Sequence, residues 1–289
     1  MLGAGLNGTV GVFTWGFRSE EVPIEWASEL EELGYASIWI PGGSGGHILD
    51  VCDRVLDSTR VITVAAGVLN IWRHEPAEVA ERSMALGQRF LLGLGISNRN
   101  LIEEYRSPIA TMRRYLDDLD AAGHDPARRA IASLNPKMTE LAGQRSLGTH
   151  PLCMPPSHAT WCRELIGPEK LVYPCVAAVL ETDPDRARAV ARGFTSTYLR
   201  LPNYASSLRR LGWSDADLAN GGSDAVVDAI VAWGDADTVA AKVRAHHEAG
   251  ATGACVQVLS RTESPRTMDM DGLRALAPAL FPDRHRTGR

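Results

Sequence analysis

The sequence lacks the features that mark membrane, secreted and nucleic-acid-binding proteins. No stretch approaches the roughly 18 consecutive apolar residues that a membrane-spanning helix needs. The first residues, MLGAGLNGTVGVFTWG, have no basic segment ahead of a long apolar core, so we expect no signal peptide. No run of lysine and arginine occurs before the tail DRHRTGR, and the net charge of the 289 residues is −5. We therefore expect neither nucleic acid nor an anionic membrane as a partner.

Cysteine is sparse, and its spacing fits neither disulfides nor a metal site. The five cysteines are scattered along the chain and include no CxxC pair. This usage predicts small buried thiols in a reduced, cytoplasmic protein. The closest approach to a metal motif is His150, Cys153, His158 and Cys162. Its order matches no zinc signature and prolines interrupt it, so we expect no metal.

The glycine and serine motifs of nucleotide-binding and hydrolytic enzymes are also missing. GGSGG at 42–46 is followed by no Gly-Lys-Ser/Thr and is not GxGxxG. Its glycines predict a loop or a close approach of the backbone to a ligand. GLGIS at 93–97 is not a nucleophile elbow, because Ser97 does not lie between the required glycines.

What the chain does contain is a repeated alternation of apolar runs and amphipathic helical patterns. The runs predict strands at 9–15, 36–41, 61–69, 89–96, 130–134, 148–154, 171–181 and 253–259. Alternation of this kind predicts a parallel sheet with helices outside it. Eight repeats in one domain of 1–289 favour an α/β fold closed into a (β/α)8 TIM barrel, with an open doubly wound sheet as the alternative. The runs at 130–134 and 148–154 are weak, so a count of seven stays open.

One interval departs from this rhythm. About seventy residues separate the last two expected strands, where one helix would suffice. We expect a helical insertion at about 200–235, which either covers the functional site or packs on the outside. The basic tail at 283–289 follows the last apolar pattern, and we expect it to be frayed.

Polar side chains gather where the expected strands end. The run 61–69 carries no charge, yet Asn70, Trp72, Arg73 and His74 follow it directly. In a parallel barrel all such ends open onto one face. Together they are rich in indole, amide, hydroxyl and glycine and poor in carboxylate. This composition suits a flat aromatic cofactor and a small-molecule substrate better than a metal or a glycosidic bond.

Several segments together resemble the luciferase-like monooxygenase superfamily, and among its members the coenzyme F420-dependent oxidoreductases. They are GYASIWIPGGSGG, AAGVLNIWRHEPAEVAER, FLLGLGIS, RYLDDLDAAG, SLNPKMTELAGQRSLGTHP and LPNYASSLRRLG. The resemblance covers nearly the whole chain, although no single motif is diagnostic. It implies a (β/α)8 barrel that holds a deazaflavin at its C-terminal mouth and transfers a hydride between this cofactor and an organic substrate. It also implies, by analogy alone, a homodimer.

The resemblance further implies which residues meet the cofactor. It places a non-prolyl cis peptide bond within 66–68, in the strand behind the cofactor ring. It assigns to Ser133, Leu134 and Asn135 the backbone that receives the hydroxyls and phosphate of the cofactor tail. The other implied contacts are Gly42, Gly43, Gly67, Val68, Asn70 and Ser97. Trp15, at the end of the first expected strand, is a further candidate.

Two departures from the family keep alternatives open. Deazaflavin enzymes of the family often have an acidic residue and a histidine directly after the second strand, where this sequence has Pro41, Gly42 and Gly43. The proton-transferring residue is then His47, His74 or His150. The segments 80–89 and 97–109 are also short against the family. The alternatives are an FMN-dependent monooxygenase of the same superfamily and a degenerate barrel that binds a flavin or a metabolite without turnover.

Overall fold

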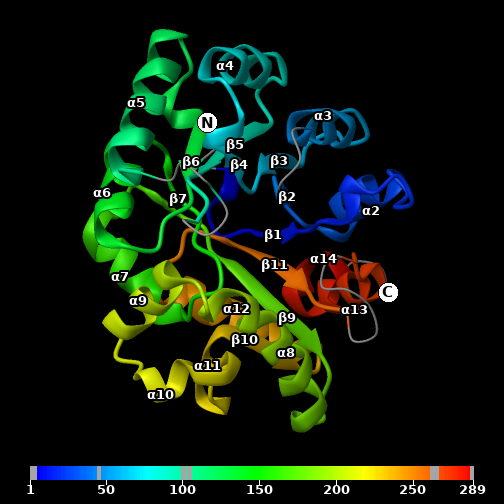
Figure 1. The fold of residues 1–289 in the computed structure, drawn as a ribbon. Coiled ribbons are helices and arrows are strands. Elements are labelled where there is room, and N and C mark those ends of the chain that lie inside the picture. Colours follow the sequence, from blue (N-terminus) through cyan, green and yellow to red (C-terminus); the bar gives the residue numbers. More distant parts are fainter. Residues whose placement is uncertain (1–4, 44–46, 99–101, 103–105, 261–266, 287–289) are drawn as a thin grey trace.

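A curled, parallel β-sheet forms the centre of the molecule, and helices surround it (Figure 1). The structure is a computed structural model that describes residues 5–43, 47–98, 102, 106–260 and 267–286. Its strands are Val10–Phe13 (β1), Ser37–Ile40 (β2), Thr63–Ala66 (β3), Leu69–Asn70 (β4), Phe90–Gly95 (β5), Arg129–Ile131 (β6), Gly148–Thr149 (β7), Leu171–Val172 (β8), Cys175–Leu180 (β9), Val231–Gly234 (β10) and Ala254–Val258 (β11).

The strand order explains the curl. Hydrogen bonding runs β10-β9-β11-β1-β2-β3-β5-β6-β7-β8, with β4 beside β5, and every pairing is parallel. Strands β8 and β9 follow each other closely along the chain. The N–H of Tyr173, between them, donates to Thr149 of β7, and the N–H of Cys255 in β11 donates to Pro174. The segment 173–174 is therefore hydrogen-bonded both to β7 and to β11.

Helices connect successive strands on the outside of the sheet. They are Glu25–Leu33 (α2), Ile48–Asp57 (α3), Pro76–Ala85 (α4), Pro108–Ala121 (α5), Pro136–Arg145 (α6), Pro156–Ile166 (α7), Pro184–Leu199 (α8), Pro202–Arg210 (α9), Asp215–Leu218 (α10), Asp224–Ile230 (α11), Ala236–Glu248 (α12), Met270–Leu280 (α13) and Pro282–Arg286 (α14). Helices α4 to α9 all begin with proline, whose fixed φ suits the first helical position and whose missing N–H is not needed there. Short 3₁₀ turns lie at Gly16–Arg18 (η1), Ile71–Arg73 (η2), Pro126–Arg128 (η3) and Ala219–Gly221 (η4).

The apolar runs of the sequence form strands that are buried in the core of the molecule. All residues of β1, β2, β5 and β11 are buried, as expected for strands with helices on one face and packed side chains on the other. All five cysteines are buried free thiols within this interior. Across the described ranges, none of the helices has the length and apolar composition to cross a membrane.

The structure corrects the expected elements in three places. The strand expected at 61–69 is divided into β3 and β4 by a cis peptide bond between Gly67 and Val68, within the stretch that the resemblance implied. The segment expected to be a helical insertion contains α9, α10 and α11, which Figure 1 shows gathered on one side, but it ends in the additional strand β10. The tail expected to be frayed from residue 283 forms α14 through Arg286, and 287–289 lie outside the described residues.

Close approach of two strands to the bend at Gly67–Val68 requires glycine on both neighbours. A Cβ atom on Gly42, after β2, would lie 2.4 Å from the carbonyl oxygen of Val68. A Cβ atom on Gly93, in β5, would lie 1.9 Å from the backbone oxygen of the last residue of β3. Gly42 and Gly93 therefore make room for the bend, a close approach between two parts of the backbone that the sequence did not predict.

Candidate active-site cavity

A cavity of about 650 Å³ opens beyond the carboxyl ends of β5, β6 and β7. Segments that directly follow these strands line it, from Ile96 to Asn98, from Ala132 to Met138, and at His150 and Leu152. The bend at Gly67–Val68, the first turn of α5 and the first turn of α9 complete the wall. This volume lies within the range of ordinary small-molecule sites, roughly 300 to 1,000 Å³.

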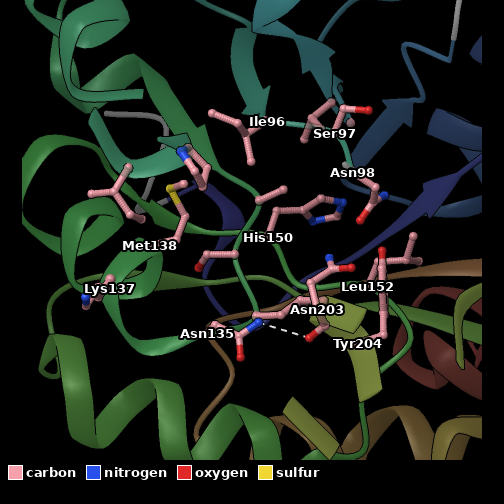
Figure 2. Close-up of a pocket in the computed structure, with 18 of the residues that line it drawn as sticks. Ile96, Ser97, Asn98, Asn135, Lys137, Met138, His150, Leu152, Asn203 and Tyr204 are labelled. Carbon is pink, nitrogen blue, oxygen red and sulfur yellow. Dashed lines mark hydrogen bonds between the residues drawn. The ribbon is translucent and has the colours of Figure 1, made fainter. Parts of the chain in front are cut away.

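The lining combines apolar walls with a few polar groups (Figure 2). Its larger apolar side chains are Phe13, Val68, Ile96, Ile109, Leu134, Met138 and Leu152. Its polar side chains are Ser97, Asn98, Ser133, Asn135, Lys137, His150, Asn203 and Tyr204. No carboxylate is among the described residues that line the cavity. The described residues also contain no cluster of three or more His, Cys, Asp and Glu able to hold a metal ion.

His150 reaches this cavity from a stack of buried rings. Its imidazole lies 4.0 Å from the ring centre of Trp39, at an angle of 12°, and Trp39 in turn stacks on Tyr173 at 5.3 Å. The ring centre of Phe13 lies 6.2 Å from that of His150, so Phe13 is the fourth ring of the group. Only 3% of His150 is exposed, so its position depends on these neighbours and not on a mobile loop.

A hydrogen bond of His150 determines which of its two nitrogens carries the proton. Its Nδ1 lies 2.6 Å from the carbonyl oxygen of Tyr173, and a carbonyl oxygen can only accept, so Nδ1 carries the proton. Burial lowers the pKa of His150 to about 4, so the ring is neutral near pH 7. Its Nε2 therefore has a free lone pair and no hydrogen-bond partner among the described residues. The cavity thus contains a fixed hydrogen-bond acceptor.

The start of α6 is the second feature of the cavity. Asn135 is the N-cap residue, but its side chain does not cap the helix. Instead its Nδ2 donates to the carbonyl oxygen of Asn203 at 2.9 Å, and its Oδ1 accepts from Ser206 and Arg210. The N–H of Thr139 donates to the carbonyl oxygen of Asn135 at 3.1 Å, whereas the N–H groups of Lys137 and Met138 have no partner among the described residues. Free N–H groups at a helix N-terminus bind anions, and Lys137, an exposed residue of the same turn, belongs to the lining.

Helix α9 is tied to the same segment. The carbonyl oxygen of Leu134 accepts from Ser207 Oγ at 2.8 Å and from His158 Nε2 at 3.2 Å. Ser133, one residue earlier, is fixed by Thr149 and Thr139, whose hydroxyl oxygens lie 2.6 and 2.8 Å from its own. The first helix of the segment predicted as an insertion therefore borders the site, which is one of the two placements that the sequence left open.

Part of the predicted site converges on this cavity. Its members in the lining are Gly67, Val68, Ser97, Ser133, Leu134, Asn135 and His150. Their contact with a cofactor stays a prediction. Sequence reasoning did not select Asn203 and Tyr204, although the segment LPNYASSLRRLG that contains them was part of the resemblance.

The structure places His47 and His74 elsewhere. The side chain of His47 is 87% exposed, and its Nδ1 lies 3.3 Å from Asp50, which also pairs with Arg82. His74 follows η2 and is half-buried, and this burial is the main cause that lowers its pKa. Neither imidazole lines the cavity, because His47 begins α3 on the outer surface and His74 leads into α4.

Asn70 closes a turn and does not line the cavity. Its Oδ1 accepts from the N–H of Trp72 at 3.1 Å and caps η2. The indole N–H of Trp72 then donates to the carbonyl oxygen of Ile96 at 2.8 Å. Asn70 and Trp72 thus connect the end of β4 to Ile96, which follows β5. These bonds hold the part of the cavity wall that Ile96 forms.

Trp15, Gly42 and Gly43 form a separate group beside the cavity. A Cβ atom on Gly43 would lie 2.9 Å from the Trp15 ring. Arg18 lies 5.9 Å from the centre of that ring and donates to the carbonyl oxygens of Pro41 and Gly42 at 2.8 and 2.6 Å. Packing and hydrogen bonds with Arg18 therefore account for the positions of these three residues. The remaining residues of GGSGG, 44–46, lie outside the described residues.

Solved structures show the same arrangement of chain. An F420-dependent secondary alcohol dehydrogenase, in complex with an F420–acetone adduct, is 13% identical at a TM-score of 0.72, with 95% of this chain and 99% of that chain covered. A coenzyme F420-dependent tetrahydromethanopterin reductase from Methanopyrus kandleri is 16% identical at a TM-score of 0.73, with 95% and 98% covered. The chain has the fold of these oxidoreductases.

Flavin enzymes share this fold too. The oxygenating constituent of 3,6-diketocamphane monooxygenase from Pseudomonas putida, a type II Baeyer–Villiger monooxygenase in complex with FMN, is 14% identical at a TM-score of 0.63, with 96% and 99% covered. No family model matches the chain, and no curated protein sequence matches it. At these identities the likeness establishes the fold alone.

Proposed function

We propose that the protein is an oxidoreductase that binds coenzyme F420 in the 650 Å³ cavity and transfers a hydride between this cofactor and a small organic substrate. The observation that carries the proposal is the content of this one cavity. Apolar walls, the free N-terminus of α6 and the neutral acceptor His150 all face the same space. Apolar walls and a free helix N-terminus suit a flat redox cofactor with an anionic tail, and the neutral acceptor suits the hydroxyl group of a substrate.

The arrangement of strands supports this position for the site. The parallel strands number eight, as in a (β/α)8 barrel, when three conditions are applied to the count. Strands β3 and β4 are counted as one strand, β8 and β9 are counted as one strand, and β10 is assigned to the insertion. In such barrels the active site lies at the carboxyl ends of the strands. The cavity lies at that end of β5, β6 and β7.

The residues present fit the two chemical parts of the cofactor. Val68, Ile96 and Met138 offer the apolar surface on which a tricyclic ring is buried. The N–H groups at the start of α6, with the ammonium of Lys137, suit the phosphate of the tail. When bound, the deazaflavin ring would supply the hydride acceptor and donor at its C5 position.

His150 then has a defined role. Oxidation of an alcohol removes a hydride from carbon and a proton from the hydroxyl group. The imidazole of His150 is neutral near pH 7 and presents a lone pair at Nε2, so it orients the hydroxyl group and accepts this proton. Its ring neighbours exclude water from the opposite face.

The second candidate is an FMN-dependent monooxygenase. It is favoured by the FMN complex among the structural neighbours, at a TM-score of 0.63. We place it second because the two F420-dependent neighbours superpose more closely, at 0.72 and 0.73.

Titration of the purified full-length protein with F420 and, separately, with FMN tests the proposal. Quenching of tryptophan fluorescence should report F420 binding in the micromolar range or tighter, with FMN at least tenfold weaker. Lys137→Met should weaken F420 binding about tenfold, because it removes a charge-assisted contact to phosphate, whereas Lys137→Arg should retain it. Tighter binding of FMN would favour the monooxygenase, and binding of neither cofactor would contradict the proposal.

A further inference from the structure

Two polar groups on the first turn of α9, in the wall of the cavity, have no hydrogen-bond partner among the described residues. The side-chain oxygen Oδ1 of Asn203 is buried, and no described residue donates to it. The hydroxyl group of Tyr204 makes no hydrogen bond to any residue that the structure describes. Figure 2 shows the ends of both side chains turned toward the middle of the cavity, on the side where His150 lies.

Neighbouring contacts fix these two groups in place. The carbonyl oxygen of Asn203 accepts from Asn135 at 2.9 Å and from Ser206 at 3.2 Å. Four residues farther along α9, Ser207 donates to Leu134 at 2.8 Å, and the ring of Tyr204 packs on Tyr198 at 5.0 Å. The backbone of α9 therefore cannot rotate to satisfy the two side chains. A ligand in the cavity can supply the partners that these two groups lack.

The chemistry of the two groups defines what such a ligand offers. An amide oxygen only accepts, so Asn203 Oδ1 requires an O–H or N–H group. Burial raises the pKa of Tyr204 well above its ordinary range, so its phenol stays protonated and donates to an oxygen. A buried acceptor without a partner is unfavourable, so a ligand that lacks the donor binds more weakly.

The charges around the cavity restrict the ligand further. The described lining contains no carboxylate to balance a cationic ligand. Its one permanently charged side chain, Lys137, lies at the start of α6, which the proposed function assigns to the cofactor phosphate. A second anionic group would have no partner among the described lining residues, so this lining fits an uncharged substrate.

We propose that Asn203 and Tyr204 select an uncharged vicinal diol. The hydroxyl group that is oxidised donates to His150 and accepts from Tyr204, while the adjacent hydroxyl donates to Asn203. This inference depends on the proposed function, because it takes the cofactor and the role of His150 from it. Helix α9 thereby becomes the specificity element of the site, and the two residues act by positioning the substrate.

Matched substrates and variants test this inference. Purified full-length protein loaded with oxidised F420 is given either a vicinal butanediol or sec-butanol, which lacks the second hydroxyl group, and the initial rate of cofactor reduction is measured. We expect kcat/KM for the diol to exceed that for the mono-alcohol at least tenfold. Asn203→Ala and Tyr204→Phe should each lower kcat/KM for the diol about tenfold and leave the Kd of F420 unchanged. Asn203→Ala should bring the ratio of the two substrates near one.

Tyr115→Phe is the matched control. Tyr115 is also a buried phenol without a hydrogen-bond partner among the described residues, but it lies in α5 and does not line the cavity. Its replacement should change neither kinetics nor cofactor affinity.

Three results would overturn the inference while the proposed function stands. They are equal rates for the two alcohols, absence of diol oxidation by the F420-loaded protein, and a loss of F420 affinity in the Asn203 and Tyr204 variants. The last result would assign these groups to the cofactor. Failure of F420 to bind the unchanged protein would instead contradict the proposed function.

Discussion

The imidazole of His150 is the residue on which the proposed chemistry depends. Replacing it by asparagine preserves a polar side chain but removes the nitrogen that accepts a proton. We expect His150→Asn to lower kcat for alcohol oxidation about 100-fold or more, the usual contribution of a general base. His74→Asn is the control, since His74 is also partly buried but lies outside the cavity. An unchanged kcat in His150→Asn would assign the ring a packing role only.

The pH dependence of kcat is a separate prediction about His150. A histidine in water would lose its acceptor nitrogen as the pH falls through about 6.5. Because burial lowers the pKa of His150 to about 4, kcat should show no acidic decline near 6.5 between pH 8 and 5. Measurement of kcat at saturating substrate across this range checks the prediction. An acidic limb centred near 6.5 that is retained in His74→Asn but absent in His150→Asn would contradict it.

Single residues also show where the sequence was informative and where it was not. His150 directly follows a strand, and position at a strand end was sufficient to select it. His47 and His74 met the same criterion but turn away from the cavity, because the chain enters a helix at each of them. Asn203 lies 68 positions from its partner Asn135. No local pattern predicts a contact of that kind.

At the scale of elements, two strands depend on glycine to pack against the bend at Gly67–Val68. Gly42→Ala places a methyl group 2.4 Å from a carbonyl oxygen that belongs to backbone and cannot move freely. We expect it to lower the free energy of unfolding by about 1 to 3 kcal/mol, as overpacked sites do. Gly193→Ala is the control, because Gly193 lies in α8 with nothing within 4 Å of its Cβ position. It should raise stability by about 0.5 to 1 kcal/mol.

Unfolding in urea, followed by circular dichroism, checks both glycine variants. Equal stability of Gly42→Ala and the unchanged protein would show that the loop after β2 yields without cost. The close approach at Gly42 would then have no structural importance.

The alternation of strand and helix was predictable because the buried strands are continuous apolar runs. The number of strands was not predictable. The run at 61–69 reads as one strand, and its single glycine, Gly67, lies where it bends and the neighbouring chains approach. Strand β10, VAWG, follows α11 without any turn residue, so its sequence continues the helical pattern. In both places tertiary pairing decided the local structure.

At the scale of the molecule, the fold is kept with few identical residues. The F420-dependent neighbours match 13% and 16% of positions over nearly the whole length of each chain. What a sheet of this kind requires is buried strands, exposed helix faces and room at the strand ends, and many side chains satisfy these requirements. The cavity is the part in which individual residues matter, and the function must be tested there.

Four buried histidines make the stability of the whole molecule depend on pH. Burial lowers the pKa values of His124, His150, His158 and His246 to about 4, below the ordinary value near 6.5 that each regains on unfolding. Between these values the unfolded chain binds more protons than the folded one. The free energy of unfolding is therefore fully retained above about 6.5 and falls as the pH drops toward 4, by at most about 3 kcal/mol for each group.

Urea unfolding at pH 7, 6, 5 and 4.5 measures this loss. The slope of the free energy of unfolding against pH gives the number of protons taken up on unfolding. We expect these four imidazoles to bring the slope close to four protons near pH 5, with additional uptake by His74 and His247, whose pKa values burial also lowers, and by carboxylates as the pH falls further. His246→Gln should remove one of these protons, because His246 is buried, has an unpartnered Nδ1 and lies outside the active-site cavity. A slope near zero between pH 6.5 and 5 would mean that the four imidazoles titrate alike in both states. The neutral His150 on which the proposed mechanism depends would then lose its physical basis.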